Sequence, residues 1–317
     1  MPLDDPPLTL CAGSMVRYPF SDIVPADSGF RALTLTKRMR VLAQRREQLS
    51  PADMRAMIRD HGLQVAEIEG TAGWLPGPGR PDDGKALGFA EALELGAAFG
   101  ASAVVAYHDD RPATSQPELI DAFAAACDRA AEFGLRLTIE FLPWSAIPDL
   151  TDALAIVEGT GRPNGRVLFD TWHHGHSALT SASLTPALAS LVSCVQIDDA
   201  QPPVSQDLIH ETTFRRCLPG TGTLPLTTML GELTTAGVDC PVAPEVYDDR
   251  VQNLTAREWA AQLAETSRRV LSAAAVAAED RRHTAVPRSS RGQPGAAPSQ
   301  RSANHGCRRS NGTGRGR

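Results

Sequence analysis

Short apolar runs alternate with longer segments of helical periodicity along most of the chain. Several of the runs are apolar almost throughout, which is typical of strands that are covered on both faces. Eight of them have the length and composition of β-strands: Leu8–Cys11, Ala32–Thr36, Gln64–Ile68, Ser102–Tyr107, Arg136–Glu140, Val167–Asp170, Leu191–Ile197 and Pro241–Glu245. Strands that alternate with helices predict βαβ units and a parallel sheet.

The segments between and after these runs carry helix signals. Ser50 is suited to cap a helix and Pro51 to its first position, while Gly134 and Gly237 each follow a helical segment and precede a strand. The predicted helices are Ser50–Asp60, Asp82–Phe99, Gln116–Phe133, Asp149–Val157, Pro225–Ala236 and Thr255–Ala278. Eight strands joined by helices predict an α/β fold of the (β/α)₈ TIM-barrel type, which takes about 250 residues.

One domain over residues 8–280 fits this barrel, with a short extension before it (1–7) and a tail after it (281–317). Two long connections, Gly70–Asp83 and Asp198–Thr223, would lie at the catalytic mouth, where long loops form lids or substrate walls.

The tail differs sharply in composition from the rest of the chain. It contains nine Arg residues and no Asp, Glu or Lys, and it has almost no large apolar side chain, so it is predicted to be disordered. An incidental solvated extension is favoured over an arm that binds polyanions. The net charge of −6 then hides a balance of −15 in residues 1–280, which argues against a barrel that binds nucleic acid.

The sequence gives no sign of membrane or secretory targeting. No apolar run reaches the roughly 20 residues of a membrane span, and the first ten residues lack the features of a signal peptide. A cytoplasmic location is therefore expected. The six cysteines form no CxxC pair, which indicates buried free thiols rather than a disulfide framework.

Four acidic or amide side chains each close, or nearly close, an apolar run: Glu140, Asp170, Gln196 and Glu245. The active site of a TIM barrel lies at the C-terminal ends of its strands, so these oxygens are expected to meet at one mouth. Carboxylate and amide oxygens suit a hard divalent cation, for which Mn²⁺, Mg²⁺ and Co²⁺ are candidates. The alternative is that the acids cap helices or pair with Arg and that the amide is solvated.

Other side chains near the predicted mouth are weaker candidates. His173 follows Asp170 by three residues, and His108 follows the fourth strand; both are candidates to contact substrate. Arg215 and Arg216 precede Pro219–Gly222, so one of them could clamp a carboxylate or phosphate, with the loop glycines letting the backbone approach. Surface or structural roles remain the alternatives for these four residues.

Glu69 and Trp74 follow the third strand and are candidates for the pocket wall. A structural role is the alternative for both.

Several segments resemble the sugar phosphate isomerase/epimerase superfamily, the xylose isomerase-like TIM barrels. They are LTIEFLPW, VLFDTWHHGHS, VSCVQIDDA, RRCLPGTGTLPL and CPVAPEVYDD, and the resemblance covers roughly residues 8–275. It implies that Glu140, Asp170, Gln196 and Glu245 are metal ligands and that His173 is a substrate-hydroxyl or supporting residue.

The chain also departs from the best-known members of that superfamily. Many members carry His where this chain has Gln196, whereas some, including bacterial 3-dehydroshikimate dehydratases, have Gln. The substrate-binding Arg of the ketose epimerases has no clear match near Pro202, and Arg215 or Arg216 is the candidate substitute from the same loop.

The resemblance implies proton abstraction α to the carbonyl of a small substrate. One of Glu140 and Glu245 would remove a proton and the other return one, while the metal holds the enediolate. An isomerase or epimerase of a small sugar or keto-polyol is the first expectation. A dehydratase of the 3-dehydroshikimate or inosose type is the alternative, because both reactions begin with the same proton removal.

Two further classes are disfavoured. A DNA-repair nuclease on this barrel would need additional histidines where Gln196-Ile197-Asp198 stands, and a non-catalytic binding protein would have no need of four ligands. The nucleotide-binding glycine patterns are absent, so neither nicotinamide nor ATP is implied. A homodimer is compatible with the exposed helices of a barrel.

Overall fold

Eight parallel strands close into a barrel in this computed structural model, which describes residue 3 and residues 5–26, 29–75, 86–108, 114–177, 184–247 and 253–285. Their spatial order is β2-β1-β11-β8-β7-β6-β5-β3, and β2 pairs with β3 to close the ring. The strands are β1 (Leu8–Leu10), β2 (Phe30–Thr36), β3 (Gln64–Ala72), β5 (Ala103–Tyr107), β6 (Arg136–Glu140), β7 (Gly165–Asp170), β8 (Val192–Ile197) and β11 (Val242–Pro244). All eight coincide with predicted strands, so the predicted TIM barrel is confirmed.

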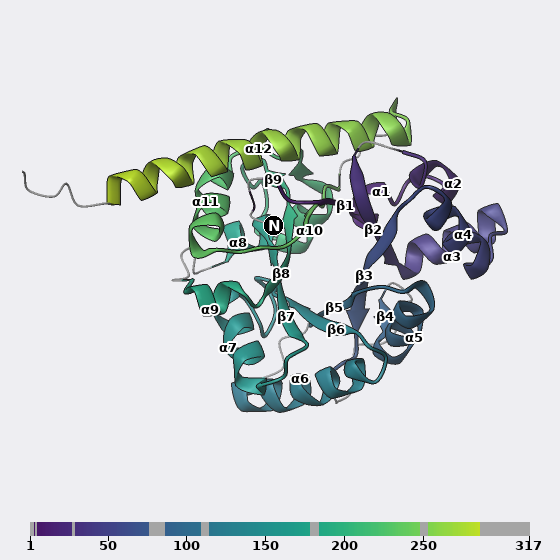
Figure 1. The fold of residues 1–317 in the computed structure, drawn as a ribbon, viewed down its shortest axis with the longest axis horizontal. Coiled ribbons are helices and arrows are strands. Elements are labelled where there is room, and N and C mark those ends of the chain that lie inside the picture. Colours follow the sequence, from purple (N-terminus) through teal and green to yellow (C-terminus); the bar gives the residue numbers. More distant parts are fainter. Residues whose placement is uncertain are drawn as a thin grey trace, which may run out of the picture.

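Helices surround the barrel and follow most of its strands (Figure 1). They are α1 (Ala12–Met15), α2 (Phe20–Ile23), α3 (Lys37–Glu47), α4 (Pro51–Asp60), α5 (Phe89–Phe99), α6 (Gln116–Ala131), α7 (Leu150–Thr160), α8 (Thr171–His176), α9 (Pro186–Ala189), α10 (Leu208–Phe214), α11 (Leu226–Ala236) and α12 (Ala256–Ala285). The predicted caps explain several starts. Ser50 accepts a hydrogen bond from the backbone of Asp53 at the start of α4, and Asp53 returns one in a capping box.

Between the second and fourth barrel strands, the structure adds one helix that was not predicted and starts another later than predicted. The sequence did not reveal α3, because its segment KRMRVLAQRRE is dominated by Arg and buries only Met39 and Ala43. The predicted helix Asp82–Phe99 begins later, at Phe89, since Leu87–Gly88 forms a short strand, β4, that pairs with the end of β3. Residues 82–85 of that prediction lie outside the described residues.

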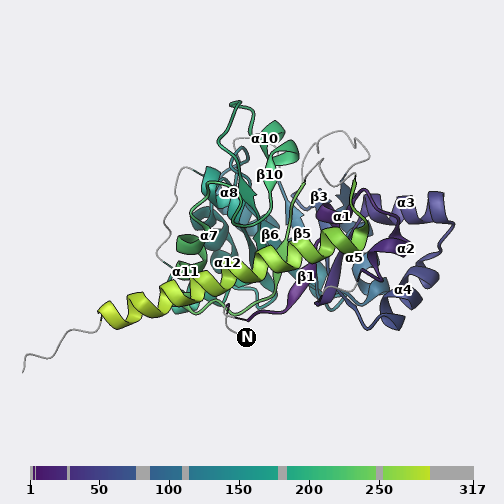
Figure 2. The same cartoon turned by 90° about the horizontal axis from the view of Figure 1, so that it is seen from above.

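The last helix is longer than predicted. α12 continues to Ala285, so the boundary predicted at Arg281 falls inside the helix, where an Ala-rich stretch sustains it. α12 runs along one side of the barrel beside α11 and α2 and extends past it (Figures 1 and 2). The remainder of the predicted tail, residues 286–317, lies outside the described residues.

The N-terminal extension predicted over residues 1–7 contributes to the barrel. Leu3 is buried in the main hydrophobic core, with 1% of its surface exposed. Among the described residues, no helix combines the length and apolarity needed to cross a membrane.

Apolar side chains fill the space between sheet and helices, and a second, smaller cluster lies inside the barrel. The inner cluster draws one side chain from each of five strands or strand ends: Cys11, Val105, Leu168, Cys194 and Ala243. Glu67 and Glu69, two residues apart on β3, are both buried. The barrel interior therefore contains an apolar cluster and, on β3, two buried acidic side chains.

A small ribbon stands on the C-terminal ends of the barrel strands. β9 (Asp199–Ala200) pairs antiparallel with β10 (Arg216–Cys217), and together with α10 it rises above the mouth at the end opposite the N-terminus (Figure 2). Both oxygens of the Asp199 carboxylate accept backbone hydrogen bonds from Gly220, Gly222 and Leu224. The glycines of this loop thus wrap around Asp199, which fixes the base of the ribbon.

Candidate functional site

The four predicted ligands stand at neighbouring strand ends. Glu140 and Asp170 are the last residues of β6 and β7, Gln196 is the penultimate residue of β8, and Glu245 directly follows β11. Asp170 is the register partner of Gln196. Because all four strands are parallel, the side chains are directed to one mouth.

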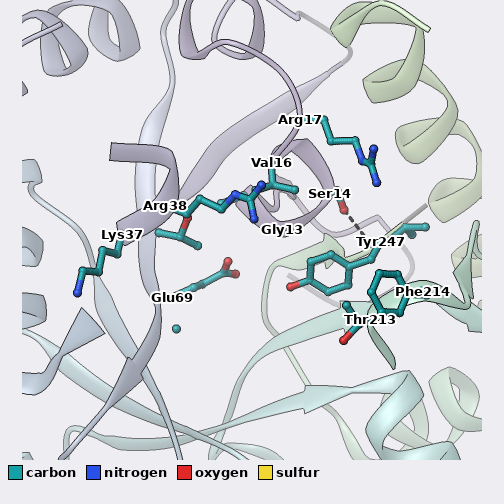
Figure 3. Close-up of a pocket in the computed structure, with 14 residues that line it drawn as sticks. Gly13, Ser14, Val16, Arg17, Lys37, Arg38, Glu69, Thr213, Phe214 and Tyr247 are labelled. Atoms are coloured by element: carbon teal, nitrogen blue, oxygen red, sulfur yellow. Dashed lines mark hydrogen bonds between the residues drawn. The ribbon is translucent and has the colours of Figure 1, made fainter. Parts of the chain in front are cut away.

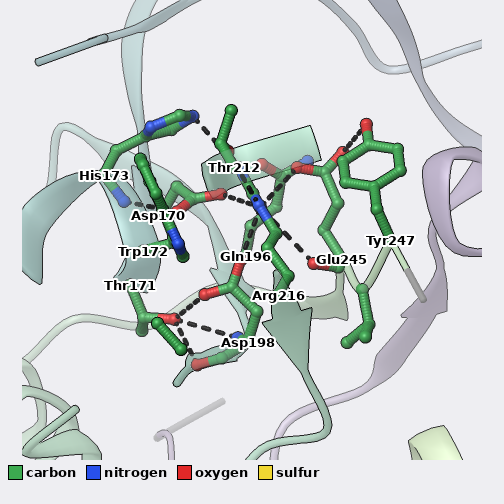
Figure 4. Close-up of polar contacts among 12 residues, drawn as sticks. Asp170, Thr171, Trp172, His173, Gln196, Asp198, Thr212, Arg216, Glu245 and Tyr247 are labelled. Atoms are coloured by element: carbon green, nitrogen blue, oxygen red, sulfur yellow. Dashed lines mark hydrogen bonds and ion pairs between the residues drawn. The ribbon is translucent and has the colours of Figure 1, made fainter. Parts of the chain in front are cut away.

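Arg216 lies at the centre of this mouth and joins three of its acids (Figure 4). Its Nη1 atom is 2.8 Å from Asp170 Oδ2 and 2.9 Å from Glu245 Oε2, and it also forms an ion pair with Asp198. Only 2% of the Arg216 side chain is exposed. Three carboxylates from β7, β11 and the end of β8 therefore share one buried counter-ion.

The orientation of the Arg216 guanidinium is fixed from several sides. Thr212 Oγ1 accepts hydrogen bonds from its Nε at 3.0 Å and its Nη2 at 2.8 Å. The guanidinium carbon also lies 5.6 Å from the ring centre of Trp172 and 5.5 Å from that of Tyr247. Arg216 is consequently a preformed part of the site and contacts the protein's own carboxylates. Of the roles that the sequence left open for it, these contacts favour the structural one over a substrate clamp.

The pKa values of these acids show the balance of burial and charge. Burial raises the pKa of Asp170, but the charge of Arg216 and then that of His173 outweigh it, so the net pKa is lowered. The pKa of Glu245 is raised because burial outweighs Arg216, and that of Asp198 is raised well above its usual range by burial and by the charge of Asp170. The charge of Arg216 therefore outweighs burial at Asp170 but not at Glu245 or Asp198.

Gln196 is held so that its oxygen is available. Its Nε2 atom donates a hydrogen bond of 3.1 Å to Glu69 Oε1, while its Oε1 atom is buried and has no hydrogen-bond partner among the described residues. Burial, followed by the charge of Glu245, raises the pKa of Glu69 well above its usual range. In this arrangement Glu69 Oε1 accepts from the amide nitrogen, which leaves the amide oxygen free. A buried carbonyl oxygen beside several carboxylates fits the donor set of a divalent cation.

His173 links Asp170 to Glu140. Its backbone N–H donates to Asp170 Oδ1 at 2.8 Å, which caps α8, and its Nε2 lies 3.3 Å from Glu140 Oε1 and 3.2 Å from Arg216 Nη2. A protonated Nε2 donates to Glu140, whereas a bare Nε2 accepts from Arg216. One carboxylate oxygen each from Glu140 and Asp170 and one ring nitrogen of His173 lie within 4.8 Å of one another, a spacing that could hold a metal ion.

A second group lies on the other side of Glu245. The Cys11 thiol is 3.4 Å from Glu245 Oε1 and 3.6 Å from each Glu69 oxygen, and Tyr247 donates to Glu245 Oε1 at 3.2 Å. Burial, followed by the charges of Glu69 and Glu245, raises the pKa of Cys11 well above its usual range, so the thiol stays protonated and donates. Cys11, Glu69 and Glu245 also have metal-compatible spacing.

Sequence reasoning did not select Cys11, Asp198 or Tyr247 as functional residues. Each lies within three residues of a strand end, which was the available signal. A cysteine at such a position resembles core packing, and Asp198 was hidden by its neighbour Gln196.

The other sequence candidates lie away from this centre. Arg215 forms an ion pair of 2.9 Å with Glu211 and donates to Pro202 O, so it is used inside its own loop. His108 follows β5 and packs edge-on against Trp74 at 6.2 Å. Trp74 is buried in the main core, and its indole donates to Tyr107 O. Substrate contact by His108 and Arg215 stays a prediction.

Comparisons with known proteins agree with this architecture. The chain is 27% identical over 216 residues to a putative hydroxypyruvate isomerase of Streptomyces coelicolor, which covers 61% of this chain and 72% of that protein. It is 26% identical over 204 residues to a 3-dehydroshikimate dehydratase of Pseudomonas aeruginosa, covering 63% of this chain but only about a third (32%) of that longer protein.

Solved structures share the fold. The crystal structure of the IOLI protein with a bound zinc atom superposes with a TM-score of 0.70 at 19% identity, covering 84% of this chain and 98% of that one. At this identity the likeness shows the fold. Residues 25–273 match the family described as xylose isomerase-like TIM barrel, which is most of the chain. The chain belongs to the xylose isomerase-like TIM barrel family.

Proposed function

We propose that this protein is a divalent-metal-dependent isomerase or epimerase that removes a proton α to the carbonyl of a small sugar, keto-polyol or hydroxy-keto acid. The observation that carries the proposal is the mouth itself. Glu140 and Asp170 have metal-compatible spacing with His173, Glu245 shares the Arg216 guanidinium with Asp170, and the Gln196 oxygen is buried without a partner among the described residues. The relatives named as a hydroxypyruvate isomerase and a dehydratase support carbonyl chemistry at such a site.

The donor set fits a divalent cation. Glu140, Asp170, Gln196 and Glu245 would hold it, because carboxylate and amide oxygens are the ligands that hard divalent cations prefer. When bound there, a divalent cation would polarise the substrate carbonyl and make the neighbouring C–H more acidic. Mn²⁺, Mg²⁺ or Co²⁺ is proposed on the basis of the oxygen ligands.

The two glutamates differ in a way that suits opposite proton transfers. Glu140 is the more exposed, at 15% against 9% for the Glu245 side chain, and it contacts His173. We assign it the removal of the α-proton. We assign Glu245, which follows β11 and accepts a hydrogen bond from Tyr247, the return of that proton to the substrate.

Asp170 and Arg216 hold the two glutamates in separate positions at the mouth. Arg216 Nη1 bridges Asp170 and Glu245, while His173 connects Asp170 to Glu140. These contacts hold the acids in position before substrate arrives, so that little reorganisation is needed during the proton transfers.

A dehydratase is the second candidate, favoured by the similarity to the Pseudomonas aeruginosa protein. It would share the first proton removal and differ in losing a β-hydroxyl afterwards.

The test is a substrate screen in D₂O with Mn²⁺, Mg²⁺ or Co²⁺ added, using hydroxypyruvate, small ketoses and 3-dehydroshikimate. An isomerase or epimerase incorporates solvent deuterium at the α-carbon and yields an isomer, seen by NMR. A dehydratase yields a conjugated product, seen as new ultraviolet absorbance. Absence of exchange and of product with every metal and substrate would contradict the proposal, and Glu140→Gln supplies the inactive control.

A further inference from the structure

A cavity of about 470 Å³ opens beside the proposed metal site, on the side of β1 and α3 (Figure 3). Its walls come from the segment after β1, the start of α3, the end of β3, the end of α10 and the residues after β11. Gly13, Arg38, Glu69, Phe214 and Tyr247 are among its lining residues.

The cavity shares walls with the proposed metal site. Glu69 accepts the Gln196 amide, and Tyr247 donates to Glu245 Oε1. Gly13 permits this close arrangement, because a Cβ at that position would lie only 2.7 Å from the Tyr247 hydroxyl oxygen and 3.0 Å from Glu245 Oε1. A ligand in the cavity therefore lies next to the residues that would hold the metal.

The charge of the cavity is opposite to that of the strand ends. Three basic side chains line it, Arg17, Lys37 and Arg38, against one carboxylate, Glu69. Figure 3 shows the Arg38 guanidinium extending from the start of α3 towards Gly13. A concave surface with several charges of one sign concentrates ligands of the other sign.

Arg38 has unused hydrogen-bonding capacity. No described residue forms an ion pair or hydrogen bond with it, whereas Lys37 already donates to Ala86 O at 3.1 Å. A guanidinium has five N–H donors in a planar fork, which matches the paired oxygens of a carboxylate or phosphate. Because Arg38 lines the cavity, its N–H groups are available to a ligand bound there.

We propose that this cavity binds an anionic group of the substrate, a carboxylate or a phosphate, through the Arg38 guanidinium, with Lys37 adding positive charge. The inference rests on the proposed function for the placement of the substrate carbonyl at the adjacent strand ends. It extends that function by selecting anionic substrates, keto acids or sugar phosphates, over neutral sugars. Phe214 supplies an apolar wall at the same cavity.

The test compares three small ligands that share a polyol and differ in their end group: D-glycerate, glycerol 3-phosphate and glycerol. Isothermal titration calorimetry is performed on the full chain as purified and again after dialysis against EDTA. The variants are Arg38→Gln and, as a matched control, Arg45→Gln. Arg45 is an exposed arginine on the same helix and does not line the cavity.

At least one anion is expected to bind more tightly than glycerol, and Arg38→Gln is expected to weaken it about tenfold, as for loss of a charge-assisted hydrogen bond. Arg45→Gln should bind as the unchanged protein does. Tighter binding of D-glycerate identifies a carboxylate subsite, and tighter binding of glycerol 3-phosphate a phosphate subsite.

The proposal is overturned if neither anion binds more tightly than glycerol, or if Arg38→Gln binds both anions as the unchanged protein does. Circular dichroism verifies the fold of each variant, and Arg38→Lys, which keeps the charge but loses the fork, provides a second variant with an intermediate expected loss. The titration involves no turnover and is repeated without metal. Its result therefore tests anion binding even if the proposed reaction is not found.

Discussion

Two arginines stand at the same barrel mouth under opposite conditions. Arg216 is buried and ion-paired to Asp170, Asp198 and Glu245, whereas Arg38 lies in a cavity wall and contacts none of the described acids. The comparison separates two uses of one residue type. A buried, fully paired guanidinium organises the protein's own charges, and an accessible, unpaired one is available to a ligand.

The same contrast extends to the two sides of the mouth. Acidic side chains lie at the ends of β6, β7 and β11, whereas basic side chains lie at the start of α3 and in the segment after β1. A substrate with a polar carbonyl at one end and an anionic group at the other would complement both sides. The following predictions test this division, from the largest expected effect to the smallest.

Removal of the proposed base on the acidic side has the largest expected effect. Glu140→Gln should lower kcat by about 10²–10⁴-fold, the range for loss of a general base, on whichever substrate shows turnover. The side chain is partly exposed, so stability should change little. Steady-state kinetics with a denaturation control measures both, and retention of kcat within a few-fold would remove Glu140 from the proton transfer.

Removal of the buried arginine should mainly affect stability. Arg216→Met leaves three buried carboxylates without their counter-ion, which is expected to lower the free energy of unfolding by about 3–5 kcal/mol. Added Mn²⁺ should restore part of the loss, because a cation would again compensate the acids. Urea denaturation with and without Mn²⁺ measures this.

The control for Arg216→Met is Arg215→Met, in the adjacent and more exposed arginine. Arg215→Met should lower the free energy of unfolding by less than Arg216→Met does, and added Mn²⁺ should not restore stability to it. Equal losses for the two variants would mean that Arg216 is an ordinary loop residue.

A further buried acid, Glu67, lies on β3 two residues before Glu69. Burial raises its pKa to about 7 from an ordinary 4.5, despite the opposing charge of Arg136. The folded state therefore holds the proton more tightly than the unfolded state, and stability falls as the pH rises from 4.5 to about 7. The full penalty is about 3 kcal/mol and stays constant above pH 7.

Glu67→Gln removes this titration. Relative to the unchanged protein it should gain stability across the same interval, with a pH-independent difference on either side of it. Denaturation midpoints at pH 4, 5.5, 7 and 8 measure the gain. A difference that does not vary with pH would show that Glu67 is not the titrating group.

The smallest effect concerns the orientation of Gln196. Glu69→Leu frees the amide that Glu69 now holds, so we expect metal affinity to fall about tenfold, the lower end of the range for residues that orient a ligand. Glu69→Gln can still accept from Gln196 Nε2 and should recover most of the affinity. Calorimetry with Mn²⁺ provides the comparison, and unchanged affinity in Glu69→Leu would exclude the orienting role.

The sequence was most informative where regular strands set the positions. Apolar runs predicted all eight barrel strands, and the polar residues at the ends of those strands predicted the place of Glu140, Asp170, Gln196 and Glu245. The end of a barrel strand fixes where its side chain points, so these positions could be predicted without knowing the tertiary contacts of each residue.

The rest depends on contacts between distant segments. The acidic partners of Arg216 lie 18 to 46 residues away along the chain, and they meet it because β9 and β10 pair above the mouth. The same holds for Cys11, whose contact with Glu245 spans 234 residues. Helix α3 was missed because its surface is charged nearly all round, which weakens the apolar periodicity.

The most direct measurement is the location of bound metal in a crystal grown with Mn²⁺, from anomalous scattering at the manganese absorption edge. The account predicts one strong peak coordinated by Glu140, Asp170, Glu245 and the Gln196 oxygen, beside Arg216. No peak at the mouth, or a peak held instead by Cys11, Glu69 and Glu245, would contradict it.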